Sequence, residues 1–223
     1  MKMDFNAEQK AAIEHGAQHL LVLAGAGTGK TRTIIGRALR LITDGVEPHR
    51  LVVVTFTRRA ANEIRSRLRR ASGGASQQVL AGTFHHLCLR IMNARRRWFG
   101  LTDVTVMDRD DQLQLMKLVR GELVGKNAAI PKAASLINYY SYARNTNQPA
   151  KDYLERFTDL EASTVETLLK IFQAYKERKR ANAYLDYDDI LHRFAKVLHD
   201  DPEIRSKVCR QYDHVLVDEM QDT

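Results

Sequence analysis

The chain has 223 residues, of which 44% are hydrophobic, enough to bury the core of one large domain or of one domain with an insertion. Lys and Arg number 35 against 27 Asp and Glu, and the net charge of +8 favours a polyanionic partner without specifying one. The two cysteines lack disulfide or metal-ligand spacing, and no segment has the pattern of a membrane span or signal peptide. We therefore expect a soluble cytoplasmic protein without membrane contacts.

The first predicted helix begins after Asn6, whose side chain is suited to capping the orphan backbone donors. Gln9 lies on this helix and has two interpretations. It is either an ordinary exposed residue or a carboxamide that recognises the two-sided edge of adenine, because it donates and accepts at once.

Residues 20–32, LLVLAGAGTGKTR, contain the segment around which we expect the chain to be organised. The apolar run 20–23 predicts a buried parallel strand, and a helical pattern begins at Lys30. Glycines between them would let the backbone approach phosphate oxygens at the N-terminus of that helix. Lys30 would lie between the β- and γ-phosphates, and the Thr31 hydroxyl would bind Mg²⁺.

This loop has the sequence of a phosphate-binding loop for ATP with Mg²⁺, with one permitted variation at its first position. Ala24 stands where the usual pattern has glycine. The predicted binding residues are Ala24, Gly25, Ala26, Gly27, Thr28, Gly29, Lys30 and Thr31.

A second buried strand is predicted over residues 51–55, followed by an amphipathic basic helix at 58–70. Ligands of open α/β sheets bind beyond the carboxyl ends of the strands. Phe56 is therefore placed either to stack on a base or to join the core, and the arginines after it to meet phosphates. A third strand, 78–84, ends at Thr83, His85 and His86; a zinc site is rejected because no Cys or acid lies at ligand spacing nearby.

From residue 101 to 180 strand patterns nearly disappear, and helices are predicted at 110–120, 131–144 and 164–179. Pro131 fits the first turn of its helix. The tyrosines at 139, 140 and 142 and the charge run 176–180 have two interpretations. They are nucleic-acid contacts or, as is favoured for any single one, core tyrosines and a solvated face.

The segment 185–191, LDYDDIL, has the composition of a metal cluster, but its helical periodicity favours a helix start with Asp186 or Asp188 as N-cap. A short helix from Pro202 to Cys209 follows. A fourth buried strand, 215–217, then precedes three polar residues that suit ATP hydrolysis: Asp218 to hold Mg²⁺, Glu219 to polarise the attacking water and Gln221 to contact the γ-phosphate.

These motifs, in this order, resemble the first part of a UvrD/Rep/PcrA-type superfamily 1 DNA helicase. Nearly the whole chain takes part in the resemblance, through a Q motif (5–9), motif I (24–31), motif Ia (55–64), motif Ib (82–85), an acidic helix start (186–191) and motif II (217–223). It implies an α/β fold in which a RecA-like P-loop NTPase core with a parallel sheet is interrupted by an inserted, mostly α-helical subdomain. The implied limits are 1–100 and 184–223 for the core and 101–183 for the insertion.

The resemblance also implies roles for individual residues. Gln9 and Arg32 would contact adenine. ATP hydrolysis would be performed by Lys30, Thr31, Asp218, Glu219 and Gln221. Single-stranded DNA, or a junction of single and double strands, would be contacted by Thr55, Phe56, Arg58, Thr83 and His85. The sequence departs from the usual residues of the family at three places: it has Arg58-Arg59 in place of Asn-Lys, Met220 in place of an aromatic residue and His86 in place of Ser.

The family also needs a second RecA-like domain, whose arginines stabilise the transferring phosphoryl group. We therefore expect the chain to be the N-terminal part of a longer, ATP-driven, 3′→5′ DNA translocase, with the remainder of its own chain as a partner. A stand-alone nucleotide- or DNA-binding module is the alternative. A small-molecule kinase shares the phosphate loop but does not explain residues 55–70 or Gln221.

Overall fold

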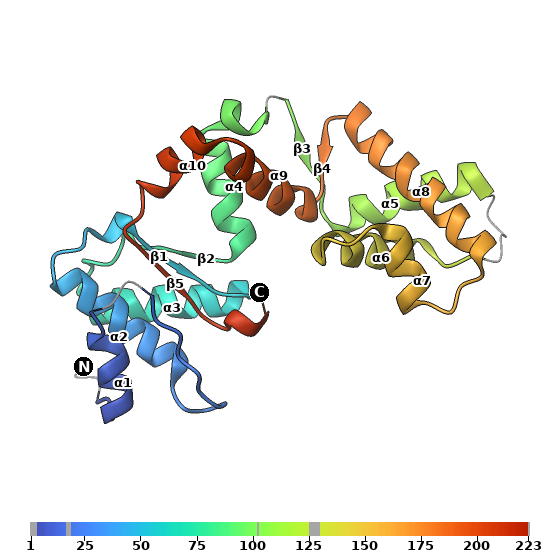
Figure 1. The fold of residues 1–223 in the computed structure, drawn as a ribbon. Helices are drawn as coiled ribbons and strands as arrows, with labels where there is room; N and C mark the ends of the chain where they lie inside the picture. The colour runs from blue at the N-terminus through green and yellow to red at the C-terminus, as the bar shows by residue number, and fades with distance from the viewer. Residues whose placement is uncertain (1–3, 17–18, 102, 125–129, 223) are drawn as a thin grey trace. The chain divides into compact units, whose positions relative to one another are not determined.

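The computed structural model describes residues 4–16, 19–101, 103–124 and 130–222, which form a mixed α/β protein with two compact units (Figure 1). The first unit, called the α/β unit, comprises Met1–Arg95 and Val197–Thr223; the second, called the helical unit, comprises Arg96–Lys196. The limits implied by the sequence resemblance differ from these and lie after residues 100 and 183. None of the described helices combines the length and hydropathy required to span a membrane.

A three-stranded parallel sheet organises the α/β unit. Its central strand is β1 (Leu51–Val54), which pairs with β2 (Leu80–Gly82) on one side and β5 (His214–Val217) on the other. Val54 lies opposite both Gly82 and Val217, so the three strands end at the same edge of the sheet. The strands predicted near these positions are confirmed, although β2 is shorter than the expected 78–84.

Helices cover both faces of this sheet because the β1 side chains alternate between them. Val53 points to the face on which α2 and α3 pack, through Ile35 and Ile64. Val52 and Val54 point to the opposite face, against which α4 packs (Figure 1). The helices of the unit are α1 (Ala7–Glu14), α2 (Lys30–Thr43), α3 (Arg58–Ala71), α4 (Phe84–Ala94) and α10 (Pro202–Cys209), with 3-10 turns η1 (Pro48–Arg50) and η3 (Met220–Asp222).

The prediction of a buried strand at residues 20–23 is wrong. This run has no strand structure, and its four apolar side chains are exposed, Leu23 by 86%. The expected burial of 215–217 is also wrong, because Val215 is exposed and the two residues after it are only half-buried. Edge position alone does not explain this exposure, since β2, the other edge strand, is buried throughout.

The helical unit is built around an apolar core formed by its four long or medium helices. Met116, Leu136, Leu154 and Leu168, one from each helix, are fully buried there. These four helices are α5 (Arg109–Val124), α6 (Ala133–Asn145), α7 (Ala150–Phe157) and α8 (Ala162–Ala181). The unit also contains the turn η2 (Arg96–Phe99) and two short strands that pair in parallel, β3 (Thr105–Val106) and β4 (Tyr184–Leu185). Helix α9 (Tyr187–Asp200) begins in this unit, and its last residues belong to the α/β unit.

Three helices of this unit agree with the sequence prediction, and two details differ. Helix α7 was not expected. Pro131 precedes α6 rather than lying in its first turn, and Lys132 occupies the N-cap position.

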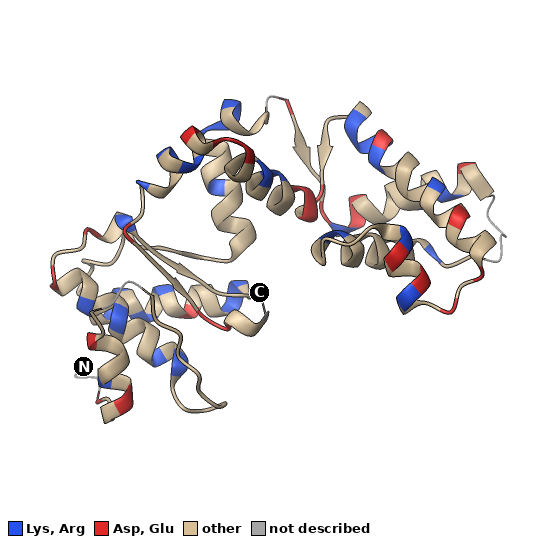
Figure 2. Cartoon of the chain, viewed as in Figure 1, with Lys and Arg blue, Asp and Glu red and all other residues tan. Residues whose placement is uncertain are grey.

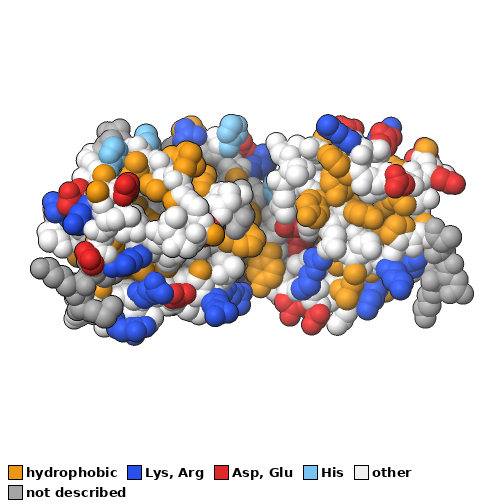
Figure 3. Space-filling model, turned by 90° about the horizontal axis from the view of Figure 1, so that it is seen from below, with side chains coloured by type: hydrophobic (Ala, Val, Ile, Leu, Met, Phe, Trp, Pro, Cys, Tyr) orange, Lys and Arg blue, Asp and Glu red, His pale blue; other side chains and the backbone are white. Residues whose placement is uncertain are grey.

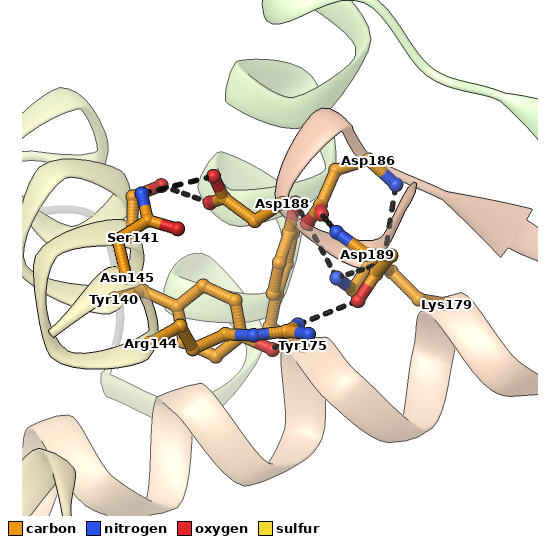
Figure 4. Close-up of polar contacts among 9 residues, drawn as sticks. All are labelled: Tyr140, Ser141, Arg144, Asn145, Tyr175, Lys179, Asp186, Asp188 and Asp189. Atoms are coloured by element: carbon orange, nitrogen blue, oxygen red, sulfur yellow. Dashed lines mark hydrogen bonds and ion pairs between the residues drawn. The ribbon is translucent and has the colours of Figure 1, made fainter. Parts of the chain in front are cut away.

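The acidic segment 186–189 starts a helix, as the sequence favours. The Asp186 carboxylate accepts from the backbone N–H of Asp189 at 2.8 Å, and the Asp189 carboxylate accepts from that of Asp186 at 3.1 Å. Lys179, only 3% exposed, donates to both carboxylates, and Arg144 donates to Asp189 (Figure 4). Burial would raise the pKa of Asp189, but Lys179 and Arg144 outweigh it and hold that pKa at about 2.

Candidate nucleotide and nucleic-acid site

The loop between residues 23 and 30 is shaped by two glycines and by its own hydrogen bonds. Gly27 and Gly29 have φ values of 77° and 91°, which favour glycine. The Thr28 hydroxyl donates to the Gly25 carbonyl at 2.8 Å. Lys30 Nζ lies 3.3 Å from the carbonyl oxygens of both Ala24 and Gly25, so its ammonium curls back over the loop.

The loop leads directly into the N-terminus of α2. Gly29 is the N-cap residue and has no side chain to cap the helix, and α2 continues for 14 residues. The first backbone N–H groups of such a helix carry partial positive charge and point away from its axis. This end of α2 therefore has the chemistry of an anion site, with Lys30 and Thr31 as its first two residues.

The structure brings the loop and the end of β5 together. The Thr31 hydroxyl donates to Asp218 Oδ2 at 3.2 Å, and Lys30 Nζ lies 4.0 Å from Glu219 Oε1. The main chain at Asp218 is fixed because its N–H donates to the Val54 carbonyl at 2.8 Å, which continues the β1–β5 pairing. Residues 187 positions apart thus meet at the carboxyl edge of the sheet.

Asp218 is a buried carboxylate beside a threonine hydroxyl. Its side chain is buried, and burial raises its pKa, an effect that the Thr31 hydrogen bond partly opposes. A hydroxyl and a carboxylate oxygen side by side are hard donors of the kind that Mg²⁺ prefers, and Mg²⁺ commonly takes only one or two protein ligands beside phosphates and water. The residues present therefore fit a magnesium ion.

Glu219 and Gln221 lie immediately beyond Asp218. Glu219 has a φ of 52°, a left-handed conformation that is uncommon for a residue other than glycine. Its carboxylate accepts a hydrogen bond from the Gln221 side-chain amide. The left-handed turn points the carboxylate towards Lys30, and strained backbone of this kind is frequent at functional sites.

Gln9 is tied to the loop from the other side. It forms a capping box with Asn6, as the sequence predicts for the cap, and its side-chain amide donates to the Thr28 carbonyl at 2.9 Å. A Cβ added at Gly29 would lie 2.9 Å from that amide nitrogen, so a larger residue at this position would have to displace the Gln9 side chain. The structure therefore places Gln9 against the phosphate loop rather than on an open helix surface.

Arg32 lies beside the same helix end. Its guanidinium carbon is 5.2 Å from the centre of the Phe5 ring, and it donates to the Asp4 carbonyl. Phe5, the first residue of the predicted Q motif, packs so closely on α2 that a Cβ at Gly36 would lie 2.8 Å from its ring. Its contact with Arg32 was not predicted, and the available signal was an aromatic residue four positions before Gln9.

The predicted nucleic-acid residues follow β1 and β2 at the same edge of the sheet. Thr55 is buried, and its N–H donates to the Gly82 carbonyl at 3.0 Å. Phe56 is 59% exposed, so of its two predicted alternatives the one in which it joins the core is wrong. Arg58 is exposed at the start of α3, whose arginines are prominent in Figure 2.

Two threonines at this edge also cap helices, which sequence reasoning did not identify. The hydroxyl of Thr57 accepts from the Ala60 N–H at 3.1 Å, and that of Thr83 accepts from the His86 N–H at 3.3 Å. His85 is half-buried in the first turn of α4. Thr83 and His85 are therefore held at the carboxyl end of β2 by the cap of α4.

Comparison with known proteins identifies one family and similar sequences within it. The model of the UvrD/REP helicase N-terminal domain family matches residues 5–223. The chain is 31% identical over 221 residues to "ATP-dependent DNA helicase UvrD1" of Mycobacterium tuberculosis (strain ATCC 25618 / H37Rv), which covers 98% of this chain and 28% of the relative. It is 28% identical over 221 residues to "ATP-dependent DNA helicase PcrA" of Staphylococcus aureus (strain NCTC 8325 / PS 47), covering 98% and 30%. The chain thus spans about three tenths of the length of these relatives.

Proposed function

Because the chain belongs to the UvrD/REP helicase N-terminal domain family, we propose that it is the ATP-binding portion of an ATP-dependent DNA helicase. In this proposal the α/β unit is the first part of a RecA-like motor domain, and the helical unit is an inserted subdomain. The complete enzyme moves along single-stranded DNA in the 3′→5′ direction, using ATP and Mg²⁺, and acts on single strands or on junctions with duplex.

One observation carries the proposal: the Thr31 hydroxyl lies 3.2 Å from the Asp218 carboxylate, beside the end of α2. A phosphate loop alone is shared by many nucleotide-binding proteins. A buried carboxylate facing its threonine provides the second half of a Mg²⁺–nucleotide site.

Each residue of the site has a distinct role in this proposal. Lys30 exchanges the loop carbonyls that it now contacts for phosphate oxygens, and the first N–H groups of α2 bind the same phosphates. Thr31 and Asp218 hold Mg²⁺, which when bound neutralises charge on the phosphates. Glu219 accepts a proton from the attacking water, and Gln221, already bonded to Glu219, contacts the γ-phosphate.

Adenine recognition in this proposal uses the residues around the start of α2. Gln9, anchored on the Thr28 carbonyl, has a carboxamide that can both donate to and accept from the base edge. Arg32 offers the face of its guanidinium once it leaves the Phe5 ring.

The open edge of β5 supports a further part of the proposal, namely that the complete enzyme adds strands to this sheet. The relatives are more than three times as long as the match, and the exposed run 20–23 and Val215 are apolar in the manner of strands that pack on both sides. A strand from the remainder of the chain would cover them. A second RecA-like domain would supply arginines to the transferring phosphoryl group, a contribution of roughly 10³ to 10⁵ in rate.

The nucleotide site is tested by thermal unfolding of the 223-residue chain with ATP and Mg²⁺. We expect nucleotide to raise the melting temperature of the wild-type chain and of the surface variant Lys170→Ala, but not of Lys30→Ala, which lacks the phosphate ligand. No protection of the wild-type chain at any nucleotide concentration would overturn the proposal. We expect very slow hydrolysis by this chain, and DNA-stimulated turnover at a full helicase rate would contradict the need for a second domain.

The nucleic-acid face is tested by titrating a labelled single-stranded oligonucleotide. Phe56→Ala should weaken binding by about 1–3 kcal/mol, the usual contribution of one stacked base, whereas Leu118→Ala on the helical unit should not. Affinity should also fall steeply with salt if the arginines of α3 meet phosphates. An unchanged affinity of Phe56→Ala would remove this side chain from the binding face.

A further inference from the structure

A row of three aromatic rings lies on the surface of the helical unit and includes Tyr142, one of the tyrosines to which the sequence gives two interpretations. Tyr142 at the end of α6 stacks on Tyr153 of α7, with ring centres 6.1 Å apart and planes within 7° of parallel. Tyr153 in turn contacts Phe157, with ring centres 5.3 Å apart. We call Tyr142, Tyr153 and Phe157 the aromatic row.

The rings at the two ends of the aromatic row are not core residues. Tyr142 is 61% exposed and Phe157 is 56% exposed. In contrast, Tyr140, two residues before Tyr142, is buried in the apolar core against Phe172 and Tyr175. The sequence favours the core for each of these tyrosines. This is confirmed for Tyr140, which stabilises the core, and wrong for Tyr142, which presents its ring to solvent.

An arginine lies at one end of the aromatic row, where the Arg156 guanidinium carbon is 5.4 Å from the centre of the Phe157 ring. Figure 3, which views the molecule from below Figure 1, shows basic side chains among the exposed hydrophobic ones of this unit.

We infer that the aromatic row is a stacking site for bases of single-stranded DNA, separate from the contacts at the sheet edge. Flat exposed rings with arginines beside them are the combination by which proteins bind single strands irrespective of sequence, because every base has a face to stack and every nucleotide a phosphate. The inference rests on the proposed function for the identity of the polyanion. A base stacks on the exposed ring of Tyr142, and Arg156, beside Phe157, contacts an adjoining phosphate.

The central experiment compares oligonucleotide binding by variants of the 223-residue chain. Tyr142→Leu keeps an apolar side chain but removes the ring, and we expect it to weaken binding at least about fivefold, the lower end for loss of one stacked base. Tyr142→Phe keeps the ring and should bind like the wild-type chain. Leu118→Ala, a similarly exposed apolar residue of the same unit, is the matched control. Thermal unfolding of each variant verifies that it is folded.

An oligonucleotide of the same length that lacks bases separates stacking from charge. It should bind more weakly, and the difference between wild type and Tyr142→Leu should vanish with it. Photo-crosslinking through halogenated uracil, mapped by mass spectrometry, should label a residue of the aromatic row as well as Phe56.

The outcomes distinguish this inference from the proposed function. Crosslinks at Phe56 alone, with equal binding by Tyr142→Leu and wild type, would overturn the stacking site and leave the proposed function in place. No oligonucleotide binding by the wild-type chain would overturn both the stacking site and the DNA part of the proposal. A concentration-dependent dimer that Tyr142→Leu abolishes, without a change in DNA binding, would assign the row to a second copy and overturn the inference.

Discussion

The two units differ in how completely their core and charged side chains are enclosed by other residues of the same unit. The helical unit has a closed core and a buried cation: Leu136 and Leu168 are fully buried, and Lys179 is enclosed by two carboxylates and two tyrosine rings (Figure 4). The α/β unit is closed around β1 but open beside the phosphate loop, where Leu23 and Val215 are exposed. Its open side is the side that carries the candidate site.

The comparison teaches that burial in this chain follows available neighbours rather than hydrophobicity alone. The runs at 20–23 and at 51–54 are equally apolar in sequence, yet only the second is a strand with helices packed on both of its faces. Lys179 and its two carboxylates are enclosed because they have one another as partners, whereas the four aliphatic side chains of 20–23 remain exposed. Four predictions sharpen this contrast.

The largest effect is expected from removing the buried cation of the helical unit. Lys179→Met should destabilise the chain by about 3–5 kcal/mol, because it leaves Asp186 without its cation in a buried place. Urea unfolding measures the change. Lys176→Met, at an exposed position of the same helix, is the control, and equal stability of the two variants would show that the ion pairs contribute little.

The closed part of the α/β unit is tested at its central strand. Leu51 is completely buried, and Leu51→Ala should cost about 2–5 kcal/mol from lost burial and the cavity left behind. Urea unfolding of this variant and of the wild-type chain measures the loss of stability. A loss below 1 kcal/mol would mean that the sheet collapses around the truncated side chain.

A smaller and pH-dependent effect is expected at Asp218. The pKa of Asp218 in the folded protein is raised, chiefly by burial, so protonation of its carboxyl favours folding. The stability that this protonation contributes is present below pH 3.8, the ordinary pKa of the group, and is lost as the pH rises through the folded pKa. Asp218→Asn should therefore raise the melting temperature at pH 8 relative to wild type, and the gain should vanish towards pH 3. The same substitution should remove protection by Mg²⁺–ATP, and a variant that is less stable at pH 8 would contradict the assignment of burial as the cause.

The smallest effect is expected in the open part of the same unit. Leu23→Ala should change stability by no more than about 0.5 kcal/mol, because the side chain is already in solvent. Comparison with Leu51→Ala in one titration gives the contrast directly. A cost approaching that of Leu51→Ala would show that the run 20–23 is packed in solution.

The sequence by itself determined the features that depend on local patterns. The glycine loop with Lys30 and Thr31, the Asn6 cap, the helix start at Asp186 and the helix Pro202–Cys209 follow from residues within a few positions of one another. The buried run at 51–54 was also predictable, since continuous apolar β-branched residues indicate a strand that is covered on both faces.

Only the tertiary structure decided which segments found neighbours. It placed Asp218 against Thr31, gave Tyr140 to the core and Tyr142 to the surface, exposed Phe56, and left residues 20–23 without a strand beside them. The physical reason is that strand pairing and burial depend on a second segment far along the chain. A local sequence pattern shows that a residue can be buried but does not supply the partner that covers it.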